Sequence, residues 1–314
     1  MKFEDILKLT QEELFDKLSS KYWGAFSNKG KYILVKGEAP IMLVAHLDTV
    51  HHTPVKHICK SDDGNIIMSP QGIGGDDRCG VYALTKVYKN STKKPWLLFT
   101  CDEETGGHGA DKFVMDYQKE ILPIELDNLK LIIEIDRKGK NDAVYYDCAN
   151  TDLETYITSK GFKTEHGSFS DISLIAPALG IAAVNLSSGY YNAHTQHEYI
   201  NKKHLENTIS RVAVIVAEAS HDDFSKYEYI DAYSYYEWDY GYDWAKLDKV
   251  YEYMPAKYDK YYGELLDYYD EGFLLDKIIK DGYDVLKELY DDVFNHYTKV
   301  VEGFKGSNVL KLVK

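Results

Sequence analysis

Short apolar runs alternate with helix-like segments along roughly the first two thirds of the chain. The apolar runs occupy residues 32–37, 41–50, 95–103, 130–136 and 180–188, and turn residues bound each of them. Runs of this kind are typical of strands that are buried on both faces of a sheet. Apolar residues recur at helical spacing over 79–88, 109–121, 170–179 and 202–219, and one more helix is predicted over about 4–20. The pattern predicts an α/β fold in which helices cover a sheet.

The composition changes from about residue 221. The segment that follows holds most of the 28 tyrosines, has an acidic excess and contains almost no strand-like run. Apolar residues in it fall close to one face of a helix, namely Leu274, Ile278, Val285, Leu289, Val293 and Val300. We therefore expect one domain over residues 1–220 and an acidic, tyrosine-rich helical region over 221–314.

Charge and hydropathy argue against a nucleic-acid-binding protein and against a membrane protein. The 314 residues carry a formal net charge of −14, and no cluster of Lys or Arg interrupts it. Such a charge opposes binding to nucleic acid or to an anionic membrane surface. No segment approaches the ~20 consecutive apolar residues of a membrane span, and the charged N-terminus does not resemble a signal peptide. The four scattered cysteines show no CxxC spacing, so we expect reduced thiols and a cytoplasmic protein.

Acidic residues and a histidine stand near the ends of predicted strands or in the turns that follow, at His46, Asp76, Glu104 and Asp136. In open α/β sheets, this edge is where ligands bind. Asp48 lies two residues after His46, so both side chains leave the strand on the same face and Asp48 could orient the imidazole ring. In GIGGDDRCG, either Asp76 or Asp77 could bridge two cations, or an aspartate there could simply cap the next helix.

Two further segments carry chemistry-bearing residues. Three consecutive acids follow an apolar run in 99–110, and because adjacent carboxylates repel one another, this cluster favours a bound cation over a solvated loop. Asp136 ends an apolar run and needs a partner, for which Arg137 is the alternative to a metal. His194 and His197 lie in a loop after 180–188. A metal site explains all of these ligand types at one sheet edge more simply than unrelated roles do.

In chain order, the motifs HLDTV, GGDDRCG, DEETGG, EID and NAHTQHEY resemble those of the co-catalytic zinc peptidases. This clan contains peptidase T, carboxypeptidase G and bacterial leucyl aminopeptidases, and the resemblance spans roughly residues 35–220. It implies a three-layer α/β/α fold around a mixed, mostly parallel sheet. It also implies two zinc ions per chain, with cobalt or manganese as substitutes, and five ligands: His46, Asp76, Glu104, Asp136 and His194.

The resemblance assigns a role to each position. Asp76 would bridge the ions, His46 and Asp136 would complete one coordination sphere, and Glu104 and His194 the other. Two more residues match the family's catalytic pair, with Glu103 as the general base and Asp48 as the residue that orients the ring of His46.

The implied activity is hydrolysis of a peptide bond by a metal-activated water, by an aminopeptidase or another exopeptidase of small peptides. Only about sixty residues separate Asp136 from His194, too few for the lid domain of peptidase T and carboxypeptidase G, so the chain looks closer to the lidless aminopeptidases. In those relatives a tyrosine can assist the oxyanion, which makes Tyr190 and Tyr191 candidates. Alternatives are a deacylase of N-acyl amino acids and a catalytically inactive scaffold. The C-terminal region could mediate homo-oligomer formation.

Overall fold

The structure is a computed structural model that describes residues 1–167, 169–232, 254–255, 257–266, 269, 274–275, 277–278, 280 and 282–291. The chain divides into two compact units, Met1–Tyr235 and Tyr236–Lys314. Each unit is described by itself below.

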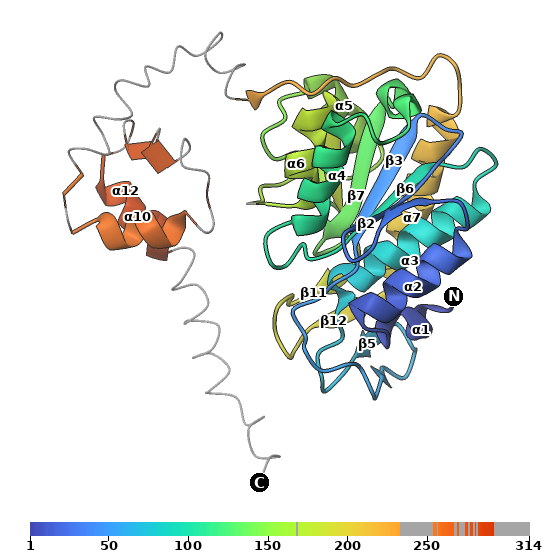
Figure 1. Cartoon of the computed structure of the whole chain (residues 1–314). Helices are drawn as coiled ribbons and strands as arrows, with labels where there is room; N and C mark the ends of the chain where they lie inside the picture. The colour runs from blue at the N-terminus through green and yellow to red at the C-terminus, as the bar shows by residue number, and fades with distance from the viewer. Residues whose placement is uncertain are drawn as a thin grey trace. The chain divides into compact units, whose positions relative to one another are not determined.

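A mixed eight-stranded sheet forms the centre of the first unit (Figure 1). In spatial order its strands are β1 (Phe26–Asn28), β2 (Tyr32–Val35), β6 (Trp96–Thr100), β3 (Ile41–His46), β7 (Leu131–Arg137), β10 (Ala183–Ser187), β8 (Asp142–Val144) and β9 (Lys163–Thr164). The four central strands, from β6 to β10, run parallel to one another. They are flanked by β2 and β8, which run antiparallel to their neighbours. All five predicted strand segments are confirmed, as is the mixed, mostly parallel sheet.

Helices cover both faces of this sheet. One face carries α3 (Gly75–Asn90), α5 (Thr151–Ser159) and α7 (Lys202–Ala219), and the other carries α4 (His108–Gln118), α6 (Asp171–Leu179) and the 3₁₀ helix η1 (Ile124–Asn128). Successive residues of β7 alternate between the two hydrophobic cores, since Ile133 packs in the first core and Ile132 in the second. The predicted three-layer α/β/α architecture is therefore confirmed.

The N-terminal helix predicted over 4–20 is wrong, because two helices occupy that range. These are α1 (Phe3–Leu7) and α2 (Gln11–Lys21). Thr10 begins the second helix with a capping box: its hydroxyl accepts the backbone N–H of Glu13, and the Glu13 carboxylate accepts that of Thr10 at 3.0 Å. A capping box starts a new helix, and its signature was present in the sequence.

A second, smaller antiparallel sheet was not predicted. Its strands, in spatial order, are β11 (Tyr190–Tyr191), β12 (Tyr199–Asn201), β5 (Ile66–Met68) and β4 (Cys59–Lys60). The pairing of β5 with β12 places Ile67 opposite Ile200. This sheet therefore ties the segment after β3 to the loop that carries His194.

The first unit continues beyond α7 to Tyr235. Glu228 forms a bridge with Ile181, and Tyr227 donates its backbone N–H to the carbonyl of Lys130. The described part of the second unit contains the helices α10 (Asp259–Leu265) and α12 (Asp284–Tyr290). These helices have a small core of their own, which includes the predicted apolar residues Leu274, Ile278 and Val285. Val293 and Val300 lie outside the described residues.

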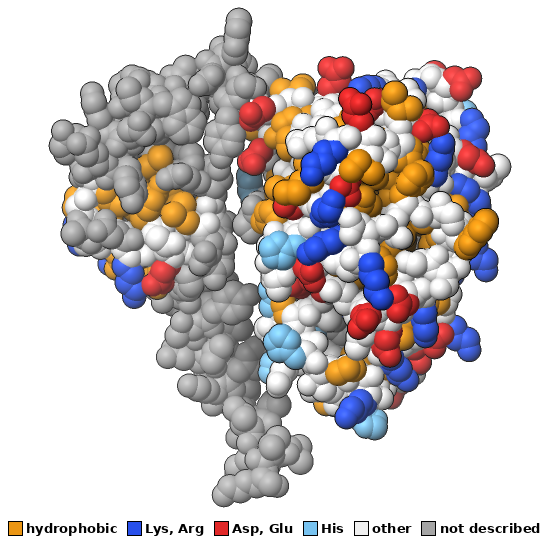
Figure 2. All heavy atoms as spheres, in the orientation of Figure 1, with side chains coloured by type: hydrophobic (Ala, Val, Ile, Leu, Met, Phe, Trp, Pro, Cys, Tyr) orange, Lys and Arg blue, Asp and Glu red, His pale blue; other side chains and the backbone are white. Residues whose placement is uncertain are grey.

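The surface of the first unit is mixed in character. On the face of the first unit seen in Figure 2, acidic and basic side chains are interspersed, with hydrophobic side chains between them. Among the residues that the structure describes, no helix combines the length and the apolar character that crossing a bilayer requires.

Candidate metal centre

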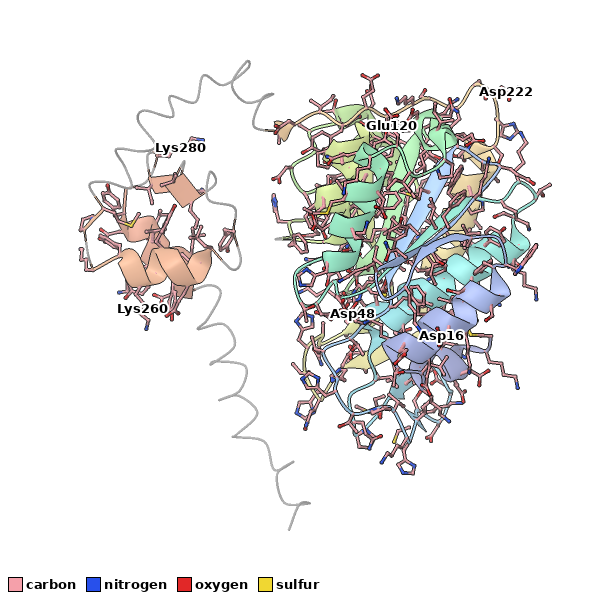
Figure 3. All side chains as sticks on the ribbon, in the orientation of Figure 1. Asp16, Asp48, Glu120, Asp222, Lys260 and Lys280 are labelled. Atoms are coloured by element: carbon pink, nitrogen blue, oxygen red, sulfur yellow. The ribbon has the colours of Figure 1, made fainter. Side chains whose placement is uncertain are left out.

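Five of the seven predicted site residues lie at the carboxyl ends of neighbouring parallel strands or just after them, whereas Asp76 lies at the start of α3 and His194 lies between β11 and β12. His46 is the last residue of β3, and Asp136 is the second-last residue of β7. Glu103 and Glu104 follow the end of β6, between β6 and α4. Parallel strands present these ends at one sheet edge, which brings distant segments together there. Figure 3 shows Asp48 at this end of the unit, opposite Glu120 at the far end of α4.

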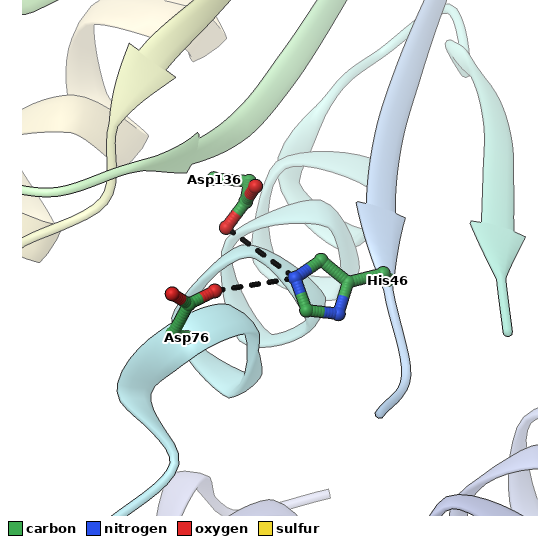
Figure 4. A group of neighbouring side chains, drawn as sticks. All are labelled: His46, Asp76 and Asp136. Atoms are coloured by element: carbon green, nitrogen blue, oxygen red, sulfur yellow. Dashed lines mark hydrogen bonds and ion pairs between the residues drawn. The ribbon is translucent and has the colours of Figure 1, made fainter. Parts of the chain in front are cut away.

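The first group of side chains consists of His46, Asp76 and Asp136 (Figure 4). The Nε2 atom of His46 lies 3.2 Å from Asp76 Oδ1 and 3.5 Å from Asp136 Oδ1. The His46 side chain is fully buried. Its ring therefore has a fixed environment made largely of carboxylates.

The second group consists of Asp76, Glu104 and His194. The Nε2 atom of His194 lies 3.0 Å from Glu104 Oε2 and 3.3 Å from Asp76 Oδ2. Asp76 thus belongs to both groups and turns one carboxylate oxygen towards each. The His194 side chain is 58% exposed, whereas that of His46 is 0% exposed, so the site opens to solvent on the His194 side.

The separations between these atoms fit two metal ions. Zinc bound at about 2.0–2.2 Å in a tetrahedral site keeps its ligand atoms about 3.4 Å apart. The nitrogen–oxygen separations within the two groups range from 3.0 to 3.5 Å. A further sign is Glu104 Oε1, which is buried and has no hydrogen-bond partner. Imidazole nitrogen and carboxylate oxygen are also a donor set that zinc accepts.

Asp48 holds the histidine and the acidic loop together. Its Oδ1 atom lies 3.2 Å from Nδ1 of His46, on the ring nitrogen opposite the metal-facing Nε2. The same carboxylate accepts the backbone N–H groups of Glu103 at 3.1 Å and Glu104 at 3.0 Å. Asp48 therefore fixes the ring and the backbone of the predicted base and ligand at once, a wider role than the sequence suggested.

The two aspartates of GGDDRCG have different surroundings. Asp76 faces both histidines, whereas Asp77 Oδ1 accepts the backbone N–H of Gly80 at 2.8 Å, as a helix-capping residue does. The peptide bond between the two aspartates is cis. Gly80 also lets α3 approach the sheet, because a Cβ atom there would lie 2.3 Å from the carbonyl oxygen of Ile135.

Glu103 forms a third group with His46 and Glu104, in which it lies at a greater distance from His46 than Asp76 and Asp136 do. Its Oε2 atom is 3.9 Å from His46 Nε2. Burial raises the pKa of Glu103 to about 7. The nearby His46 lowers this pKa, and repulsion from Asp171 and other nearby acids raises it. A carboxyl group that titrates near neutral pH is suited to accept and return a proton.

The remaining pKa shifts reflect the crowding of charged side chains at the site. Burial is the largest single effect on the pKa of His46 and lowers it, but the charge of Asp136 and the hydrogen bonds to Asp136, Asp48 and Asp76 together raise this pKa well above its ordinary value. Burial and the charge of Asp76 raise the pKa of Asp136. Hydrogen bonds to Asp76 and Glu104 raise the pKa of His194 to about 10.

Two residues at the site have a left-handed backbone. Asp102 has φ of 60° and His194 has φ of 61°, a region that costs a non-glycine residue roughly 1–2 kcal/mol. Contacts from elsewhere hold Asp102 in place. The Gln11 amide donates to Asp102 Oδ1 at 2.8 Å and accepts the backbone N–H of Asp102 at 3.1 Å. Sequence reasoning missed Gln11, because nothing in the sequence connects it with this loop.

Of four other candidates from the sequence, Tyr190 stays at the site, where its hydroxyl lies 3.5 Å from Asp136 Oδ1, and the other three are directed elsewhere. Arg137 donates to the carbonyl of His166. The hydroxyl of Tyr190 donates to the backbone carbonyl of Asp136 at 2.9 Å, and that of Tyr191 lies 2.7 Å from His204 Nδ1. His197 is exposed and belongs to neither group. A residue that the sequence analysis did not single out, Glu198, is fully buried beside Asp76.

Fold and site together define an α/β protein with a candidate two-ion centre at the carboxyl edge of its sheet. Among solved structures, the aminopeptidase PepT from Bacillus cereus ATCC 10987 is 16% identical, with a TM-score of 0.53 over 70% of this chain and 97% of that one. A tripeptidase from Staphylococcus aureus subsp. aureus mu50 is 16% identical, with a TM-score of 0.53 over 69% of this chain and 96% of that one.

A third similar structure is archaeal. The TET aminopeptidase from the marine sediment archaeon Thaumarchaeota archaeon SCGC AB-539-E09 is 12% identical, with a TM-score of 0.52 over 68% of this chain and 96% of that one. No family model matches the chain, and no curated protein matches it in sequence. The predicted resemblance to the co-catalytic zinc peptidases is therefore confirmed at the level of the fold.

Proposed function

We propose that this chain is a metal-dependent peptidase that cleaves short peptides from their amino end. Two zinc ions would be held by His46, Asp76, Glu104, Asp136 and His194. The observation that carries the proposal is the arrangement of Asp76, whose two carboxylate oxygens face separate groups of ligand atoms at 3.2 and 3.3 Å. All five residues lie within 1–220, the segment that we propose as the catalytic domain.

When bound, the zinc ions would supply Lewis acidity that activates water and polarises the scissile carbonyl. The protein's own residues would move the proton. Glu103 accepts it from the attacking water and returns it to the leaving nitrogen, a role that its position beside both groups supports. Asp48 keeps the ring of His46 and the backbone of Glu103 in fixed relation.

Charge favours recognition of a free α-amine. Five carboxylates converge on the site, from Asp48, Asp76, Glu103, Glu104 and Asp136. They outweigh the four positive charges of two divalent ions, so the occupied site keeps a negative charge. Such a site attracts the ammonium group of an unblocked peptide and repels a terminal carboxylate. This supports an aminopeptidase more than an enzyme that binds the carboxyl end of a peptide.

The experiment combines elemental analysis of the purified full chain with hydrolysis of unblocked and N-acetylated peptides, with and without a chelator. We expect about two zinc ions per chain and chelator-sensitive cleavage of unblocked peptides only. Cleavage restricted to acetylated substrates would instead identify a deacylase. A protein that binds no divalent metal and cleaves neither series would refute the proposal and favour a scaffold. Light scattering on the same sample tests the predicted homo-oligomer.

A further inference from the structure

Glu198 is a fully buried carboxylate that no part of the proposed reaction uses. Its Oε2 atom accepts the backbone N–H of Gly74 at 2.9 Å and lies 2.8 Å from Nε2 of His51. Its Oε1 atom accepts the backbone N–H of Asp76 at 3.0 Å. A carboxylate can only accept, so all three neighbours act as donors when Glu198 is ionised.

The three donors belong to two of the segments that meet at the site, and Glu198 belongs to a third. His51 lies five residues after His46, Gly74 lies two residues before Asp76, and Glu198 itself lies four residues after His194. One side chain therefore joins the segments that supply His46, Asp76 and His194. Gly75 allows close packing beside this junction, because a Cβ atom there would lie 2.7 Å from Cβ of Tyr190, 2.8 Å from Ile200 and 3.1 Å from Glu198 Oε1.

The contact with Asp76 has a particular consequence. The backbone N–H that Glu198 holds belongs to the residue whose side chain faces both ligand groups, and only two side-chain torsions separate that backbone from the carboxylate. A small movement of the Asp76 backbone would shift Oδ1 away from His46 and Oδ2 away from His194 together. Either shift breaks one of the 3.2–3.3 Å separations.

We propose that Glu198 is a positioning residue that sets Asp76 for both metal ions at once. The inference rests on the proposed two-ion site. Residues that orient metal ligands typically change affinity about 10- to 100-fold when they are removed. Loss of Glu198 should therefore weaken both zinc-binding steps in parallel by about this factor. Loss of His194, which belongs to one group, should weaken one step far more than the other.

The test uses the full chain, stripped of metal and titrated with zinc against a chromophoric chelator. The variants are Glu198→Gln and His194→Ala, with Asp116→Asn as the control. Asp116 is also a buried carboxylate, but its partners are the hydroxyl of Tyr32 at 2.8 Å and the ammonium group of Lys112, which lie outside the segments that supply the five ligands. Thermal unfolding of each metal-free variant measures the structural cost separately. Glu198→Gln should weaken both steps, whereas Asp116→Asn should lower the melting temperature alone.

Each outcome has one meaning. If the wild type binds no zinc, both the proposed function and this inference fail. If the wild type binds two ions and folded Glu198→Gln binds them with unchanged affinity, the inference alone is overturned. Should Glu198→Gln not fold, His51→Ala removes one donor from a partly exposed position. It should produce a smaller parallel weakening of both steps, and unchanged affinity in that variant overturns the inference equally.

Discussion

Replacing Glu103 by glutamine separates proton transfer from metal binding. The Oε2 atom of Glu103 lies 3.9 Å from His46 Nε2, whereas Oε2 of the adjacent Glu104 lies 3.0 Å from His194 Nε2. We expect Glu103→Gln to keep two zinc ions and to lower kcat by about 10²- to 10⁴-fold, the usual effect of losing a general base. Glu104→Gln should lose zinc and is the matched comparison.

The same substitution has a calculable effect on the stability of the metal-free protein. Burial raises the pKa of Glu103 from 4.5 to about 7. Above pH 7 this carboxylate is charged in both states, and the charge costs more free energy in the folded state than in the unfolded state. The difference corresponds to about 3 kcal/mol. Below about pH 4.5 the group is protonated in both states and the penalty is absent. At pH 8, metal-free Glu103→Gln should therefore be more stable than the wild type by up to about 3 kcal/mol.

The assay pairs steady-state hydrolysis of an unblocked peptide with zinc content, and adds urea unfolding of the metal-free proteins at pH 5 and pH 8. The stability gain should be largest at pH 8 and should shrink towards pH 5. Loss of zinc from Glu103→Gln would show that Glu103 is a ligand rather than a base. A variant that keeps both zinc and full kcat would refute the assigned role, and a stability gain independent of pH would refute the electrostatic reasoning.

Three further substitutions probe the surroundings of the site. Asp48→Asn should lower kcat/KM about 10- to 100-fold, because an amide cannot accept hydrogen bonds from the ring and both backbone N–H groups; steady-state kinetics with an exposed Asp63→Asn control measure this. Asp76→Asn should reduce the zinc content below one ion per chain, as elemental analysis would show, and retention of two ions would contradict a bridging role. Gln11→Ala should lower the free energy of unfolding by about 1–3 kcal/mol through the loss of two hydrogen bonds, whereas the exposed Glu12→Ala should not.

The main elements were predictable because hydrophobic periodicity determines them. The helix predicted over 202–219 is α7, with the same bounds, and every long apolar run became a strand of the central sheet. The second sheet could not be predicted in the same way. Its strands β4 and β11 have two residues each, and a period cannot be recognised in two residues. Their existence depends on pairing between segments far apart in the sequence.

The candidate ligands stand out in the sequence because each belongs to a short motif after a strand. Apart from Asp48, the residues that support them do not. Glu198 reaches the backbone of Asp76 across 122 positions, and Gln11 reaches Asp102 across 91. Each is one polar side chain that accepts a backbone N–H from a distant segment, and its neighbours in the sequence give no sign of that contact. Only the folded arrangement reveals such residues.

The pair Asp76–Asp77 shows why a helix cap and a metal ligand need not be competing interpretations. The sequence left open which aspartate does what, because a lone aspartate at a helix start is most often a cap. In the structure both residues have non-helical backbone angles, so their side chains leave in different directions. Asp77 turns inward and caps α3 through Gly80, which frees Asp76 to face the two histidines. Two adjacent acids therefore let one turn both start the helix and serve the site, which a single aspartate could not do.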